Sequence, residues 1–87
     1  MSDTVITNPT RKQLPPDPDR LNEDRSSWAG AAITTFIHVT GTDEEDAVAD
    51  LLADLIHYCD RKGTDFETAL DRARGHYEAE TAGEEAA

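Results

Sequence analysis

Cysteine is almost absent from this sequence of 87 residues, because Cys59 is its single representative. No disulfide can form within one copy of the chain, and such cysteine usage is typical of reducing compartments, so we expect a cytoplasmic location. The surrounding pattern places Cys59 on the apolar side of an expected helix, where a free thiol behaves as a small hydrophobic side chain. We therefore expect no catalytic thiol.

Long hydrophobic runs are missing too. No stretch approaches the roughly 18 apolar residues that a membrane span needs, and the N-terminus lacks the basic start and apolar segment of a secretion signal. The sequence also contains no glycine-rich phosphate loop, no cysteine pair and no nucleophile motif. We expect no membrane binding, no cofactor, no catalytic residue and no enzymatic activity.

Positive charge is scarce: 8 Lys and Arg stand against 19 Asp and Glu, which gives a net charge of −11. Residues 1–21 carry three charges of each sign, so the whole excess lies in residues 22–87. Such a domain is repelled by nucleic-acid phosphates and anionic lipids. The composition excludes direct nucleic-acid binding and favours a partner with a basic protein surface.

All four prolines fall within residues 1–21. Proline cannot donate a backbone hydrogen bond, and it biases the preceding residue toward extended conformations. We expect residues 1–21 to form a flexible or extended arm, with a short extended piece at Val5 and Ile6. Residues 22–81 form the helical domain, and the small acidic residues 82–87 form a frayed tail.

The strongest helix signal spans residues 42–63. Thr42 and Glu45 form a capping box, in which each side chain bonds the other's backbone N–H, and Gly63 suits the left-handed residue that ends a helix. Between them, apolar residues recur at spacings of three and four, which places them on one side of the helix. They are Val48, Leu51, Leu52, Leu55, Ile56 and Cys59.

Two further helices are expected, over residues 22–40 and 64–81, and the second opens with another capping box at Thr64 and Glu67. The β-branched residues of the first give its end some strand character. The predicted core sides are Trp28, Ala32, Phe36 and Val39 in the first helix, and Phe66, Ala69, Leu70, Ala73 and Tyr77 in the last.

Tight glycine-containing turns at Gly41 and Gly63 favour antiparallel neighbours. The sequence therefore predicts an all-α fold: a three-helix bundle made of an antiparallel hairpin over 42–81 and a helix over 22–40, with the extended arm. The apolar arc of residues 22–40 is wider than one neighbouring helix would bury. Trp28, Ile33 and Ile37 are accordingly candidates for the contact surface of a homodimer or another partner.

The side of the central helix opposite its apolar residues is acidic. It carries the predicted partner-binding residues Asp43, Asp46, Asp50, Asp54 and His57. Carboxylates four residues apart lie roughly 6 Å apart along a helix, which resembles the phosphate spacing of a single strand, and they repel one another by a few tenths of a kcal/mol. Two interpretations stay open: a solvated side, or a side that a basic partner recognises.

The three histidines do not predict a metal site. In an up-down-up arrangement His38 and His76 lie toward one end of the bundle and His57 toward the other, which disfavours a three-histidine zinc site. Asp54 and His57 share one side of the central helix, but a bundle metal site needs a second such pair. We expect no metal.

Residues 50–78 resemble the C-terminal helices of the MazG-like nucleoside triphosphate pyrophosphohydrolases. The match comprises an Asp that opens an aliphatic helix, a Gly-x-Asp turn, a Glu-x-Ala-Leu run and an aromatic-Glu pair: Asp50, Gly63, Asp65, Glu67, Ala69, Leu70, Tyr77 and Glu78. The resemblance implies a helical hairpin. The family's magnesium site is not carried over, because Ala47 occupies the position of a required Glu, and Trp28–Thr40 contains no acid.

The small, acidic, helical character is similar to that of short phage and plasmid proteins, among which anti-CRISPR and anti-restriction inhibitors occur. Three functions therefore stay open. The first is a non-enzymatic module whose acidic helix binds a basic surface, as an inhibitor of a nucleic-acid-binding complex does when it presents carboxylates in place of phosphates. The second is a degenerate or active MazG-like hydrolase. The third is a small structural or regulatory homodimer.

Overall fold

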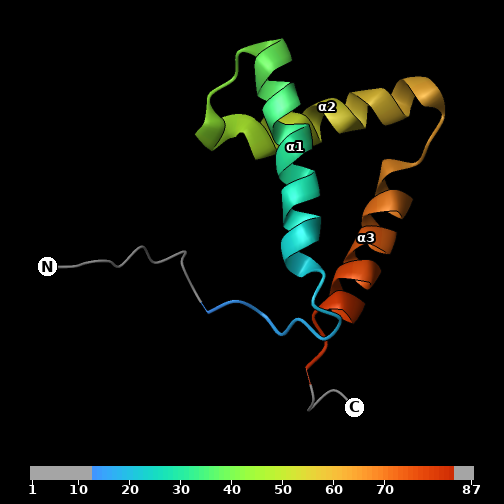
Figure 1. Cartoon of the computed structure of the whole chain (residues 1–87). Helices are drawn as coiled ribbons and strands as arrows, with labels where there is room; N and C mark the ends of the chain where they lie inside the picture. The colour runs from blue at the N-terminus through green and yellow to red at the C-terminus, as the bar shows by residue number, and fades with distance from the viewer. Residues whose placement is uncertain (1–12, 84–87) are drawn as a thin grey trace, which may run out of the picture.

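The computed structural model describes residues 13–83, which contain three α-helices, a single 3-10 turn and no strand. The elements are α1 (Asn22–Thr40), η1 (Glu44–Asp46), α2 (Ala47–Lys62) and α3 (Phe66–Glu80), and Figure 1 labels the three α-helices. The all-α prediction is confirmed. The expected extended piece at Val5 and Ile6 and most of the expected frayed tail lie outside the described residues.

Both helix ends that were predicted from glycine are confirmed. Gly41 and Gly63 each have a φ of 75°, a left-handed conformation that costs glycine little. The Gly41 N–H donates to the carbonyl of Ile37 at 2.7 Å, and the N–H groups of Gly63 and Thr64 both donate to the carbonyl of Cys59. These bonds satisfy carbonyls that the helix itself leaves without partners.

The two capping boxes were wrong. A 3-10 turn intervenes between Thr42 and α2, and the Thr42 hydroxyl donates to the carboxylate of Asp50 instead of capping a backbone N–H. At the start of α3 the N-terminal flanking residue is Asp65, whose carboxylate accepts from the Thr68 hydroxyl at 2.6 Å and makes no side-chain cap. In both places a nearby hydroxyl–carboxylate pair replaces the expected bond to the backbone.

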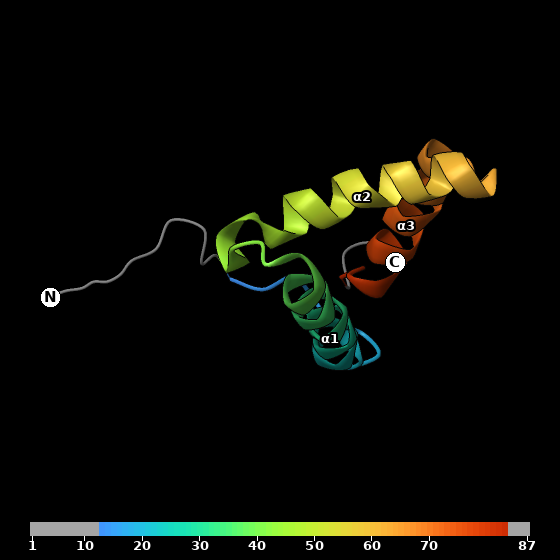
Figure 2. The same ribbon diagram turned by 90° about the horizontal axis from the view of Figure 1, so that it is seen from above.

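The three helices are arranged as a flat triangle. In Figure 1, α2 crosses α1, and α3 runs from the end of α2 back to the beginning of α1; Figure 2 shows the same arrangement from above. The extents are 44 × 39 × 19 Å and the radius of gyration is 16.1 Å, against roughly 12 Å for a compact domain of this length. The helices meet near their ends, so the packing of the predicted bundle is present only in part.

The core is correspondingly small. The buried hydrophobic residues of the described part are Ala47, with no exposed surface, and Cys59, 8% exposed. In α1 the half-buried hydrophobic residues are Ile33, Phe36 and Ile37, in the half of the helix that α2 crosses (Figure 1). The predicted α1 core side was partly wrong, because Trp28 and Val39 are 65% and 77% exposed. The crossing of α2 selects a side of α1 rotated away from these two residues.

Candidate functional site

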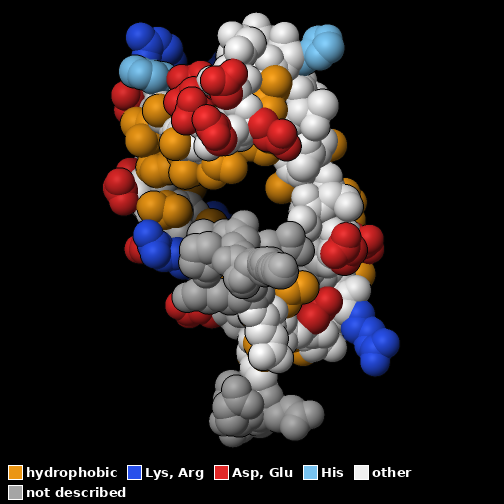
Figure 3. All heavy atoms as spheres, turned by 90° about the vertical axis from the view of Figure 1, so that its left-hand side faces the viewer, with side chains coloured by type: hydrophobic (Ala, Val, Ile, Leu, Met, Phe, Trp, Pro, Cys, Tyr) orange, Lys and Arg blue, Asp and Glu red, His pale blue; other side chains and the backbone are white. Residues whose placement is uncertain are grey.

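The apolar side of α2 is open along its middle. We call Val48, Leu52, Leu55 and Ile56 the α2 apolar surface; their exposed fractions range from 39 to 62%. Ala47 and Cys59, which are buried, lie toward the two ends of the helix, and the exposed residues of the α2 apolar surface lie between them. Figure 3 shows an opening through the molecule, with hydrophobic side chains gathered along its edge.

The predicted partner-binding residues, which we call the acidic row, are all exposed. Asp43 precedes η1 and Asp46 ends it, whereas Asp50, Asp54 and His57 belong to α2. On a helical projection of α2, the last three lie opposite the α2 apolar surface. Acidic side chains gather on the face of the molecule shown in Figure 3. Within residues 13–83, no member of the acidic row forms an ion pair with Lys or Arg.

One member of the acidic row has an intramolecular partner. The Asp50 carboxylate accepts the hydrogen bond from the half-buried Thr42, which fastens the loop after α1 to the first turn of α2. The loop therefore has a defined position relative to the helix. Asp54, one turn further along, has no such bond among the described residues. The acidic row thus contains one carboxylate held by a hydrogen bond within the chain and one that is not.

The three residues expected to form a dimer or partner surface on α1 are divided by the structure. Trp28 is largely exposed, whereas Ile33 and Ile37 are half-buried near the crossing with α2. Trp28 is thus available for contact with another molecule, whereas Ile33 and Ile37 are partly covered within the chain itself. The more extensive open hydrophobic surface lies on α2.

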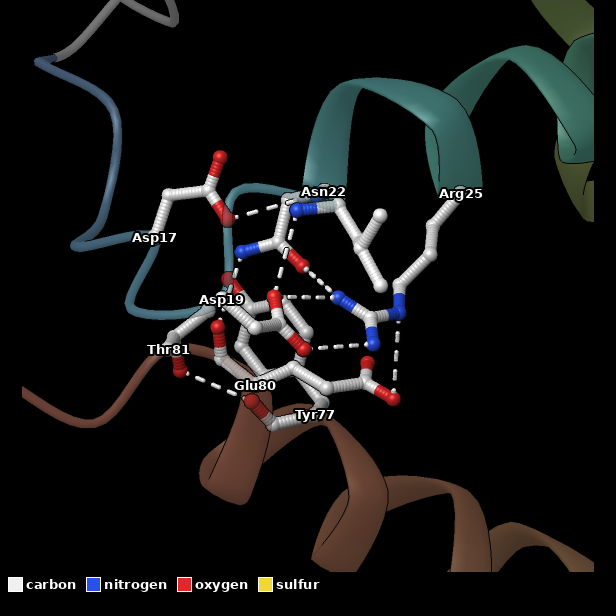
Figure 4. Close-up of polar contacts among 8 residues, drawn as sticks. Asp17, Asp19, Asn22, Arg25, Tyr77, Glu80 and Thr81 are labelled. Carbon is white, nitrogen blue, oxygen red and sulfur yellow. Dashed lines mark hydrogen bonds and ion pairs between the residues drawn. The ribbon is translucent and has the colours of Figure 1, made fainter.

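A polar junction joins the arm, the start of α1 and the end of α3 (Figure 4). The Arg25 guanidinium donates to both carboxylate oxygens of Asp19, at 3.0 and 2.9 Å, and its Nε lies 3.3 Å from the Glu80 carboxylate. The Asn22 amide donates to the backbone carbonyl of Glu80 at 2.8 Å. We call this set, with Asp17, the junction. It connects residues 58 positions apart and completes the triangle.

Sequence reasoning missed the junction, although one signal was present. Asp17-Pro18-Asp19-Arg20 is a turn in which the Arg20 N–H donates to the Asp17 carbonyl at 3.1 Å. Aspartate followed by proline is a common start of such turns. The turn delivers Asp19 to Arg25, so residues 17–21 are folded against the helical domain. The flexible or extended arm expected over residues 1–21 stays a prediction.

The contact between Asp19 and Arg25 shifts the pKa of both groups. Hydrogen bonding from the Arg25 side chain lowers the pKa of the Asp19 carboxyl to about 2, and the same contact raises the pKa of Arg25. Both side chains are partly exposed to water. A hollow of about 400 Å³ lies beside them, lined by arm residues Leu14 and Pro15 and by Tyr77 of α3. The junction thus joins the arm, α1 and α3 around the ionised Asp19 carboxylate and its partner Arg25.

The described part contains no cluster of three or more His, Cys, Asp or Glu side chains that could hold a metal ion. The Asp50 carboxylate, which the MazG-like resemblance would assign to magnesium, is engaged with Thr42. None of the helices between residues 13 and 83 combines the length and hydrophobicity that crossing a bilayer requires.

Comparisons with known proteins add no further identification. No protein-family model matches the chain, and no curated protein or solved structure was found to be similar to it.

Proposed function

We propose that this protein is a non-enzymatic binding module that presents the acidic row to a basic surface of another protein. The observation that carries the proposal is the exposure of all five residues without any ion pair to Lys or Arg in the described part of the chain. Carboxylates left in this state attract a cationic partner and accelerate its association.

The arrangement of charge supports a directed contact. Asp50 and Asp54 lie one helical turn apart on a single side of α2, and the loop beside them is fastened by the Thr42 hydroxyl. A row of carboxylates at this spacing is compatible with a protein surface that normally binds phosphates. The partner class that we propose is a nucleic-acid-binding complex in the cytoplasm, which the protein inhibits by occupying the basic surface.

The test is a binding experiment with matched charge reversals. The full chain is immobilised and exposed to an extract of the cells that produce it, and bound proteins are eluted with a salt gradient. A triple variant, Asp46→Lys, Asp50→Lys and Asp54→Lys, reverses three of the four carboxylates of the acidic row. The control carries Glu67→Lys, Asp71→Lys and Glu78→Lys on α3, so both variants have the same net charge. Circular dichroism checks that both variants remain helical.

We expect the partner to bind the wild type and the α3 control, and to be lost from the acidic-row variant. Binding should weaken steeply toward 1 M salt, where the screening length is only about 3 Å. Single-stranded nucleic acid should displace the protein from the partner. Binding that is insensitive to salt, or that both triple variants lose equally, contradicts the proposal.

A nucleotide pyrophosphohydrolase is the competing function, and it has its own decisive measurement. Purified protein is incubated with magnesium and a panel of nucleoside triphosphates, and pyrophosphate release is followed. The binding function predicts no release above background. Release that Asp50→Asn abolishes would replace the binding proposal with a catalytic one.

A further inference from the structure

The α2 apolar surface is open in a single chain, and we propose that a second copy of the same chain covers it. The two copies pack Val48, Leu52, Leu55 and Ile56 against their counterparts across a two-fold axis that passes near Leu52 and Leu55. This inference is independent of the acidic row and of its partner.

The first argument is that one chain buries too little to hold its helices together. Ordering each residue costs about 1–2 kcal/mol of backbone entropy, and helices as short as α2 and α3, of 16 and 15 residues, are marginal in water without an apolar neighbour. Against this, the described residues bury only Ala47 and Cys59 among hydrophobic side chains. The fold therefore needs further hydrophobic burial in every molecule.

Within residues 13–83, no further element supplies it. No helix of the described part lies across the opening in Figure 3. Ten large hydrophobic side chains of the described residues are exposed, and four of them form the α2 apolar surface. Monomeric proteins rarely expose hydrophobic patches larger than a few hundred Å².

The second argument identifies the occupant. A partner that every molecule needs for stability must be present in equal amount wherever the chain is made, and a second copy meets this condition. A basic foreign protein would be attracted to the acidic row and not to the α2 apolar surface, which bears no charge. The aliphatic side chains of the α2 apolar surface on one copy can pack against the same aliphatic side chains on the other.

Charge distribution permits this self-association. Each copy carries a net charge of −11, so two copies repel unless their contact surface excludes the acidic residues. The α2 apolar surface does so, because Asp50 and Asp54 lie on the opposite side of the helix. Two chains that meet through this surface direct both acidic rows outward, where water and salt screen them.

Two-fold symmetry fixes which residues approach each other. In an isologous contact the same patch serves both subunits, and its central residues lie nearest the axis. Leu52 and Leu55 are central in the patch and in α2, which spans Ala47–Lys62. Each should therefore lie close to its own counterpart in the other copy.

The first test measures mass and helicity together over a dilution series, by light scattering and circular dichroism. We expect the wild type to have twice the mass of one 9.5 kDa chain and to lose helicity as it dissociates. Leu55→Asp should raise the dissociation constant at least tenfold. Ala53→Asp adds the same charge to an exposed position on the acidic side of α2 and should leave the dimer intact.

A fully helical wild-type monomer at low micromolar concentration would overturn the proposal, as would a Leu55→Asp dimer as tight as the wild type. Because Leu55→Asp also weakens folding, a second variant at the same position introduces no charge. In a Cys59→Ala background, Leu55→Cys should form a covalent dimer with a short bis-maleimide, whereas the matched Ala53→Cys should not. Equal cross-linking of the two variants, or none in either, rejects the two-fold contact.

Discussion

The Arg25 guanidinium donates two parallel hydrogen bonds to the Asp19 carboxylate, from Nη1 to Oδ1 at 3.0 Å and from Nη2 to Oδ2 at 2.9 Å. The planar guanidinium is the side chain best suited to such a two-point contact with a carboxylate. Since Arg25 also lies 3.3 Å from the Glu80 carboxylate, the pair is linked to the end of α3.

The Asp19–Arg25 pair predicts a loss of stability in acid. The pKa of Asp19 falls from 3.8 to about 2 in the folded chain, so the folded state favours the ionised carboxylate. Its stabilising effect is fully present above about pH 4 and disappears as the pH falls toward 2. Thermal unfolding followed by circular dichroism from pH 7 to 2 should show this loss, and an NMR titration should give the Asp19 pKa directly.

The control for the pH experiment is Asp19→Asn, which keeps the shape of the side chain and removes its titration. Its melting temperature should be lower than that of the wild type at pH 7, and the two should converge near pH 2. Arg25→Lys should behave similarly, because an ammonium group cannot make both bonds at once. Wild type and Asp19→Asn curves that stay parallel throughout would show that the pair has no effect on stability.

Four of the five glycines form two pairs with opposite expected responses to alanine. Gly41 and Gly63 have a φ of 75°, so alanine there should destabilise the protein by about 1–2 kcal/mol. Gly30 and Gly75 lie inside helices with open space around an added methyl group, so alanine should stabilise by about 0.5–1 kcal/mol. Urea unfolding of the four single variants measures the difference, and the same sign in all four would contradict the assigned helix ends.

The bond between Thr42 and Asp50 predicts which threonine variant is tolerated. Thr42→Val removes the hydroxyl and should cost about 0.5–1.5 kcal/mol, whereas Thr42→Ser keeps the donor and should cost less. If Asp50 is the acceptor, Thr42→Val should have little further effect in an Asp50→Ala background. A double-mutant cycle from urea unfolding gives this coupling; full additivity would instead restore the original interpretation of Thr42 as a helix cap.

Cys59 should be protected from thiol reagents in the folded protein. It is 8% exposed, so its reaction with a disulfide reagent requires local or global opening. We expect labelling to be at least about tenfold slower than that of an exposed thiol, Ala53→Cys in a Cys59→Ala background, and to reach the same rate in denaturant. Cys59→Ser should destabilise by about 1–3 kcal/mol, since it buries a hydroxyl.

The helices and their ends were predictable because their signals are local. The hydrophobic spacing of Leu51 and Leu55 and the left-handed glycines at positions 41 and 63 act over a few residues, and the structure reproduces them. The helix starts were less predictable. Thr42 had an alternative acceptor eight residues away, and a local capping rule cannot weigh that competition.

The sequence could not reveal how the helices sit against one another. Trp28 looked buried because several hydrophobic residues share its side of α1, but the buried side is set by where α2 crosses. Arg25 and Glu80 are far apart in the sequence, so no short pattern connects them. The exposure of the acidic row could be predicted because charged residues at helical spacing usually face water. The partner of the acidic row remains a proposal.

The triangle has one vertex unlike the other two. Between α1 and α2, and between α2 and α3, the chain itself is continuous, whereas α3 returns to α1 through side chains, chiefly those of Arg25, Asn22 and Glu80. Among the described residues this vertex can therefore separate without melting a helix. Fluorescent labels near Asn22 and Thr81 would register such a swing as a longer distance while the circular dichroism spectrum stays unchanged.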